Sequence, residues 1–405
     1  MRFYTYSMLC VILCVCNTSC GQQNSISSTI AQEFVEEIRS DLSTNSQEFV
    51  KEIRSDLSTI SQEFVEEIRS DLSTISQELL NSKKSNGIVV EHFDIGWKKD
   101  EKAIAHFWRA MPADSQPKGI FLYIAGTSIL NLESMAEKFA EYGFLFVGLS
   151  WGELNTKYSL FCGETKQEIL LKAASCALFL ANNFIPYDAD IPLILMGASN
   201  GGIIATLVNE LSAAPIAGII YYMSSGGFTL SGNSQSYMYE AYPGYAKLFD
   251  PYYISTKSNK SYAIISTNDM YFPFEHAYPW LRSRTGNNVF IIENDNHQAR
   301  GIDVDALIMK FIQTINMQEQ MNKQYTDPIV SIHDSRIIVN WQDVNVEKIL
   351  YSLGDKTMYS YFFDISLFYK IHIKESNSMN NTMLLIHGIS KDTELPISYF
   401  TRISP

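Results

Sequence analysis

The chain has 405 residues, of which 46% are hydrophobic and 13% aromatic. This is enough apolar material for at least one full core, so the collagen-like, disordered and disulfide-scaffold classes are excluded. The formal net charge is −13, and so acidic a chain lacks the positive surface that binds nucleic-acid phosphates. We therefore expect no nucleic-acid partner.

The first residues have the pattern of a secretory leader. Arg2 precedes an apolar run of nine residues, Met8 to Cys16. As a helix this run would span about 14 Å, far less than the roughly 30 Å of a bilayer core. We therefore assign residues 1–20 to a signal peptide and expect the protein to be exported.

The end of this leader resembles the cleavage site of a bacterial lipoprotein. Small Thr18 and Ser19 stand ahead of Cys20, although Asn17 departs from the aliphatic residue usual at its position. The resemblance implies lipidation of Cys20 and a partner membrane reached through a lipid anchor. Ordinary cleavage, which would leave a secreted protein, is the alternative.

A repeat with a period of 15 residues follows the leader. The sequence QEFVEEIRSDLST starts at residues 32 and 62, and QEFVKEIRSDLST starts at residue 47. Apolar residues recur within each copy at steps of 3 or 4, which predicts helix. We assign residues 21–86 to a helical stalk, in which 3.75 residues per turn would require a right-handed supercoil. A homo-oligomeric coiled coil, a plain spacer and short helices broken at the Ser/Thr clusters all fit this pattern.

The acidity of the chain is concentrated in that repeat. Residues 32–80 contain 12 acidic and 4 basic side chains, a net charge of −8. The net charge therefore indicates a solvated spacer and says little about a substrate.

From residue 87 to residue 325, strand patterns alternate with amphipathic helical patterns. Two opening strands and then several continuous apolar strands predict an α/β fold with a mostly parallel, eight-stranded sheet. The expected strands are residues 87–93, 103–111, 119–126, 144–150, 191–197, 216–223, 262–267 and 288–293.

One of these strands runs into the segment GASNGG, residues 197–202, and then into an apolar helix. A G-x-S-x-G pattern between a strand and a helix is typical of a nucleophile elbow, which makes Ser199 the candidate nucleophile. Ser150 lies in a second match, GLSWG, but bulky Trp151 and a polar loop follow it. Ser199 is therefore preferred.

A nucleophilic serine needs a base and a group that orients the base. Asp269 and His297 both follow strands, at the edge where open α/β sheets collect site residues. His276 and Asp295 are the rivals, but His276 falls in a predicted helix and Asp295 is only two residues from His297. The predicted triad is Ser199, Asp269 and His297.

Residues 87–317 resemble the α/β-hydrolase superfamily. The segments GASNGG, STNDMYFPFEHAYPWL and IIENDNHQARG are similar to the elbow, acid loop and histidine loop of its prolyl-oligopeptidase-like and dienelactone-hydrolase-like branches. The resemblance implies the same triad, with oxyanion donors from the backbone of Asn200 and Thr127. The usual His-Gly before the second donor is Ala125-Gly126 here. No cofactor and no metal is expected.

An insertion at about residues 224–261 is rich in tyrosine. Its place beside the predicted site suggests a small cap, with Tyr237, Tyr239 and Tyr242 lining a substrate pocket. A surface loop packed by its own rings is the alternative.

The sequence leaves two interpretations of Cys162 and Cys176. The two form a disulfide bond in one interpretation, whereas Cys176 is a core residue in the other.

Residues 326–405 lose helical periodicity and contain short strand patterns separated by turn signals. They predict a small β-sandwich with Trp341 in its core, serving either as a binding module or as a spacer.

Taken together, these patterns predict an exported serine hydrolase that cleaves carboxylic esters through an acyl-enzyme. Its substrates would be small-molecule, lipid or glycan esters. A serine peptidase and an inactive surface interaction protein are the alternatives.

Overall fold

The computed structural model describes residues 72–97, 100–128, 130–152, 163–184, 191–226, 250–251, 260–286, 288–298, 302–316, 325–333, 336–353, 362–364 and 382–403. Several predictions lie outside these residues: the signal peptide with Cys20, the stalk repeat up to residue 71, and most of the tyrosine-rich insertion.

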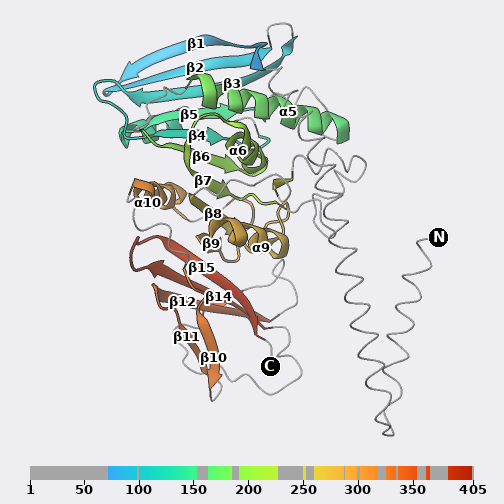
Figure 1. Cartoon of the computed structure of the whole chain (residues 1–405), viewed down its shortest axis with the longest axis vertical. Coiled ribbons are helices and arrows are strands. Elements are labelled where there is room, and N and C mark those ends of the chain that lie inside the picture. The colour runs from blue at the N-terminus through green and yellow to red at the C-terminus, as the bar shows by residue number, and fades with distance from the viewer. Residues whose placement is uncertain are drawn as a thin grey trace, which may run out of the picture. The chain divides into compact units, whose positions relative to one another are not determined.

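A nine-stranded sheet forms the centre of the described chain, with the order β1-β2-β3-β5-β4-β6-β7-β8-β9 (Figure 1). Its strands are β1 (Ile75–Ser85), β2 (Ile88–Trp97), β3 (Asp100–Pro112), β4 (Ile120–Ile124), β5 (Leu145–Ser150), β6 (Leu193–Ala198), β7 (Ile216–Tyr222), β8 (Lys260–Ser266) and β9 (Val289–Ile292). All eight strands predicted from the sequence are present, with ends shifted by a few residues.

The strand directions divide the sheet into two parts. The pairs from β1 to β5 along the sheet, β1–β2, β2–β3 and β3–β5, are antiparallel. Every pair from β5 to β9 is parallel. Three antiparallel opening strands, one more than the sequence predicts, and then a parallel sheet that reverses its order at β4 and β5 fit the predicted α/β-hydrolase fold.

The sheet has nine strands rather than the eight predicted, because residues 75–85 form β1. The repeat predicts a helical stalk that extends to residue 86, and that boundary is wrong. The fading repeat is mostly polar here, and pairing with β2 supplies the backbone hydrogen bonds that a helix would otherwise provide. As the edge strand, β1 needs only one buried apolar anchor, Ile75, which is 5% exposed.

The parallel strands are buried on both faces. In β4, Ile120, Leu122 and Ile124 point into one apolar core, and Phe121 and Tyr123 point into the other. This burial explains why the strands have continuous apolar runs instead of alternating patterns.

Helices from different parts of the chain cover these two cores. The first core includes α5 (Gly163–Phe179), with its π-helical extension η1 (Leu180–Phe184), α6 (Asn200–Leu211) and α9 (Phe274–Thr285). The second includes α3 (Glu133–Glu141) and α10 (Val304–Asn316). No helix in the described part of the chain is both long and apolar enough to cross a membrane.

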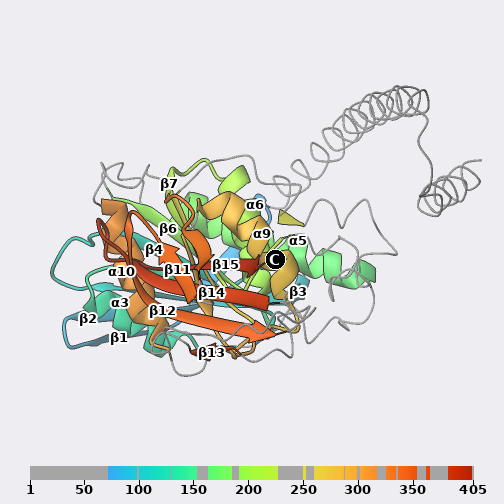
Figure 2. The same cartoon turned by 90° about the horizontal axis from the view of Figure 1, so that it is seen from below.

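The described C-terminal residues are β-structured, as predicted. They form a hairpin, β10 (Ile329–His333) and β11 (Arg336–Asn340), and a four-stranded antiparallel sheet of β13 (Phe363–Asp364), β12 (Val344–Leu353), β14 (Thr382–Ser390) and β15 (Pro396–Ile403). Figure 2 shows β12, β14 and β15 side by side. We call this four-stranded sheet the C-terminal sheet.

The C-terminal sheet packs against the β9 edge of the large sheet (Figure 1). Ile386 and Ile397 join the same apolar core as Tyr262 of β8, and the Tyr262 hydroxyl donates a hydrogen bond to Pro396 O at 2.8 Å. Trp341 is 4% exposed and joins this same shared core, whereas the prediction placed it in the core of a separate sandwich. The sheet thus shares its core with the α/β part; a self-contained sandwich stays a prediction.

Candidate active site

The candidate nucleophile lies between the end of β6 and the start of α6. Ser199 has φ 53° and ψ −127°, a left-handed backbone conformation that non-glycine residues rarely adopt. Its backbone N–H donates to Tyr222 O at 2.9 Å, which ties the turn to neighbouring β7. The strand, the strained turn and the helix are the parts of a nucleophile elbow.

The glycines around Ser199 are required by close packing. A Cβ atom at Gly197 would overlap the backbone of Gly201 and Gly202. A Cβ atom at Gly201 would overlap the carbonyl groups at the end of β4, and one at Gly202 would overlap the Ser224 side chain. Only glycine therefore lets α6 start this close to the sheet.

The candidate acid, Asp269, follows β8 and is 2% exposed. Its Oδ1 atom accepts hydrogen bonds from the backbone N–H groups of Tyr271 at 2.8 Å and Phe272 at 3.1 Å. These two bonds hold the carboxyl group in one orientation and leave Oδ2 for another partner.

That partner is the candidate base, His297, which follows β9. His297 Nδ1 lies 2.6 Å from Asp269 Oδ2, and 22% of the histidine side chain is exposed. An Nδ1–H group that donates to Asp269 leaves Nε2 as the proton acceptor. The carboxylate of the rival Asp295 instead accepts at Oδ1 a hydrogen bond from Asn296 N at 2.7 Å.

The topology brings the three residues to one edge of the sheet. Strands β6, β7, β8 and β9 are adjacent and parallel, so their carboxyl ends share that edge. Ser199, Asp269 and His297 each follow the carboxyl end of one of them. The other rival residues have different surroundings: His276 is inside α9, and Ser150, at the carboxyl end of parallel β5, accepts at Oγ a hydrogen bond from Leu130 N at 3.1 Å.

The loop predicted to supply an oxyanion donor passes directly beside Ser199. A Cβ atom at Gly126 would lie 3.1 Å from the Ser199 Cβ atom. Ala125 is held on both sides, because its N–H donates to Leu149 O at 3.0 Å and its carbonyl accepts from Trp151 Nε1 at 2.6 Å. Thr127 follows this anchored segment. Trp151, a reason to reject Ser150 as nucleophile, thus helps to position the loop.

Asn200, the other predicted donor, is the first residue of α6 and is 7% exposed. The first backbone N–H groups of a helix point out of its N-terminus and carry partial positive charge. Such groups stabilise the negative charge that develops on a carbonyl oxygen under attack.

Two tyrosines of β7 lie beside the elbow and remain neutral. Burial raises the pKa of Tyr221 to about 12, although a hydrogen bond with Thr206 acts in the opposite direction. Burial also raises the pKa of Tyr222. Neither phenol therefore supplies a base near neutral pH.

Two aromatic side chains near the histidine were not predicted as site residues. The ring of Tyr271, which is 48% exposed, lies 5.0 Å from the His297 ring in an edge-to-face arrangement, and the buried Phe272 ring stacks on His297 at 5.9 Å. The signal was their position shortly after Asp269. The predicted pocket residues Tyr237, Tyr239 and Tyr242 lie outside the described residues.

The described residues contain no group of three or more His, Cys, Asp or Glu side chains that could hold a metal ion. Cys176 is buried in the core beside α6, whereas Cys162 lies outside the described residues. The buried position of Cys176 agrees with its interpretation as a core residue, and the disulfide, the other interpretation, stays a prediction.

No family model and no curated protein matches this chain. Among solved structures, acetyl xylan esterase 1 from Thermoanaerobacterium sp. JW/SL YS485 is 13% identical, with a TM-score of 0.46 over 64% of this chain and 93% of its own. The acetyl xylan esterase from Paenibacillus sp. R4 is 13% identical, with a TM-score of 0.47 over 63% of this chain and 93% of its own.

A glucuronoyl esterase from Solibacter usitatus is 11% identical, with a TM-score of 0.45 over 60% of this chain and 86% of its own. At such identities and scores, an activity has to be derived from the site of this chain itself.

Proposed function

We propose that the protein is a serine hydrolase that cleaves carboxylic esters through an acyl-enzyme. Ser199 is the nucleophile, His297 the general base and Asp269 the residue that orients it. The observation that carries the proposal is the hydrogen-bonded pair of His297 and Asp269, 2.6 Å apart, at the sheet edge that also presents Ser199 on its strained turn.

The reaction follows from these positions. Ser199 Oγ attacks the ester carbonyl carbon while His297 Nε2 accepts the hydroxyl proton. The backbone N–H groups of Asn200 and Thr127 stabilise the oxyanion. The C–O bond then breaks, and the alcohol leaves with the proton held by His297. A water molecule, deprotonated by His297, attacks the acyl group, which releases the carboxylic acid and restores the Ser199 hydroxyl.

The experiment is steady-state turnover of short p-nitrophenyl esters by the full chain and by two serine variants. Ser199→Ala should lower kcat by about 10³-fold or more, because it removes the attacking atom. Ser150→Ala is the matched control, since it deletes a hydroxyl from the rival motif, and it should keep kcat within a few-fold. Wild-type turnover by Ser199→Ala would contradict the proposal.

Export and anchoring complete the proposal and rest on the sequence alone. The short apolar leader and Cys20 favour an exported, lipid-anchored enzyme, with the repeat as a spacer between membrane and enzyme. A fatty-acid label that is incorporated by the wild-type chain but not by Cys20→Ser supports the anchor, and equal incorporation contradicts it.

A further inference from the structure

The segment that carries His297, residues 293–298, is held by two separate sets of contacts; we call it the histidine loop. One set comes from β8 and the residues after it. Asn268 N donates to Asp295 O at 3.0 Å, and Ser266 Oγ donates to Asn296 O at 2.8 Å. These bonds connect the loop to the strand that leads to Asp269.

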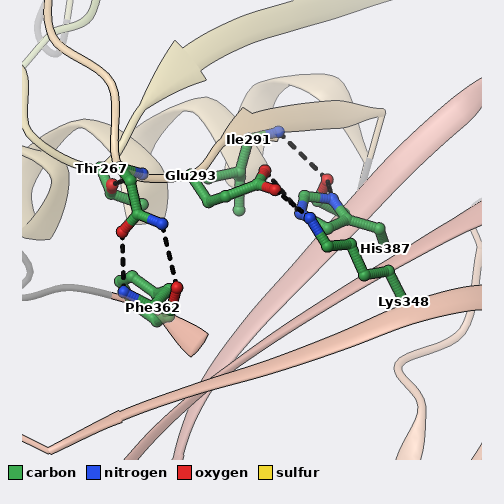
Figure 3. A network of polar contacts seen from close by, with 8 residues as sticks. Thr267, Ile291, Glu293, Lys348, Phe362 and His387 are labelled. Atoms are coloured by element: carbon green, nitrogen blue, oxygen red, sulfur yellow. Dashed lines mark hydrogen bonds and ion pairs between the residues drawn. The ribbon is translucent and has the colours of Figure 1, made fainter. Parts of the chain in front are cut away.

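The other set comes from the C-terminal sheet and from Phe362, the residue directly before its strand β13 and about 70 residues later in the chain (Figure 3). The Asn294 side chain donates from Nδ2 to Phe362 O at 2.9 Å and accepts at Oδ1 from Phe362 N at 2.7 Å. One amide side chain thus satisfies both backbone groups of a residue that is 1% exposed. Two bonds between the same pair of residues define an orientation as well as a distance.

The backbone of Asn294 explains why this contact bears on His297. Asn294 has φ 59°, so the chain reverses there in a left-handed conformation that asparagine tolerates better than most residues. Its N–H donates to Thr267 Oγ1 at 2.9 Å. This bend directs the next three residues toward Asp269. Thr267, directly after β8, holds its backbone, and Phe362, directly before β13, holds its side chain.

Glu293, the residue before the bend, is held by charged and polar side chains. Glu293 forms an ion pair with Lys348 of β12, and its Oε2 atom lies 3.2 Å from His387 Nε2 of β14 (Figure 3). His387 Nδ1 in turn lies 2.7 Å from Ser398 Oγ, which accepts a hydrogen bond from Ile291 N of β9 at 3.1 Å. Both residues at the start of the histidine loop are thus attached to the C-terminal sheet.

We propose that Asn294 is a positioning residue, through which the C-terminal sheet holds the histidine loop so that His297 is aligned with Ser199. This inference rests on the proposed function, because it assigns the alignment of the base in that reaction. It also gives the C-terminal sheet a role in turnover rather than in binding or spacing alone.

The experiment compares Asn294→Gly with Tyr278→Phe in the full chain. Glycine accepts the positive φ but removes both bonds to Phe362. Tyr278→Phe is the matched control, because it removes a 3.0 Å bond from Phe400 N across the same interface without touching the histidine loop. Thermal melting first establishes that each variant is folded at the assay temperature. If Asn294→Gly does not fold, Glu293→Gln is measured in its place.

Asn294→Gly should lower kcat for p-nitrophenyl esters by about 10- to 100-fold and leave KM within about two-fold, because a displaced base slows the chemistry without removing substrate contacts. Tyr278→Phe should keep kcat within about two-fold at a comparable loss of melting temperature. An unchanged kcat in Asn294→Gly, or an equal loss in Tyr278→Phe, overturns the proposal.

Hydrogen exchange separates this inference from the proposed function, because it needs no turnover. Amides of residues 294–298 should exchange faster in Asn294→Gly than in the wild-type chain, while those of β8 should not change. Exchange that stays at the wild-type rate overturns the inference. Absence of ester turnover by the wild-type chain overturns the proposed function instead.

Discussion

At the scale of single residues, the site depends on a few positions that general rules of chain conformation disfavour. The backbone of Ser199 costs about 1–3 kcal/mol of strain, which surrounding packing has to compensate. The compensation comes from Gly197, Gly201 and Gly202, which let β4, β6 and α6 approach closely. Asn294 is the second residue of this region with a disfavoured positive φ, and its side-chain amide is hydrogen-bonded to Phe362 through both its nitrogen and its oxygen.

Tyr271 offers a test at the same scale. Its exposed ring lies next to His297. If His297 is the base of the proposed reaction, we expect this ring to contact the leaving group or the acyl chain. Tyr271→Ala should raise KM for p-nitrophenyl butyrate about five-fold, which corresponds to about 1 kcal/mol of lost apolar contact, with a smaller change in kcat.

Tyr142→Ala is the control for this variant, since Tyr142 is also a partly exposed tyrosine, 38% exposed, but lies after α3. It should leave KM unchanged. Wild-type KM in Tyr271→Ala would show that the ring does not contact the substrate.

At the scale of elements, polar contacts at the β9 edge connect the large sheet to the C-terminal sheet. Burial raises the pKa of Glu293, but its bonds to His387 and Lys348 outweigh this effect and lower the pKa to about 2. The folded pKa is thus below the ordinary value of 4.5, so the folded state favours the ionised carboxylate. The stabilisation is complete above pH 4.5 and is lost as the pH falls toward 2.

Thermal melting between pH 7 and pH 3 checks this contribution. The wild-type chain should lose stability in the lower half of this range, and Glu293→Gln should lose less there because it has no carboxylate to protonate. At pH 7 the variant should be less stable by about 1–3 kcal/mol. Glu133→Gln, which removes an exposed ion pair with Lys83, should melt close to the wild type. An identical pH dependence in wild type and Glu293→Gln would contradict the assignment.

At the scale of the whole molecule, local patterns predicted the strands and the candidate site, and long-range contacts escaped them. Continuous apolar runs identify the eight strands because both sheet faces are buried. The motif around Ser199 and the strand ends before Asp269 and His297 could be identified from the sequence, because the proposed chemistry depends on those residue types at those positions. The identity of β1 was missed, since an edge strand pairs through its backbone and needs little apolar signal.

The attachment of the C-terminal sheet was equally invisible to sequence patterns. Asn294 and Phe362 are far apart in the chain. Asn294 lies in the segment that resembles a histidine loop, but nothing in that segment points to a contact with Phe362. In the sequence, His387 has no feature that distinguishes it from a structural histidine. Its pairing with Glu293 becomes visible only in the fold, which brings the end of β9 next to β14. Such contacts depend on tertiary packing.

The most direct test of the central claim is labelling of the intact, folded chain with a fluorophosphonate, followed by mass spectrometry of its peptides. These reagents phosphonylate serines that an adjacent base has activated. We predict one label per chain, located on Ser199 and absent from Ser199→Ala. A folded wild-type chain that takes up no label, or that carries the label on Ser150, would contradict the account.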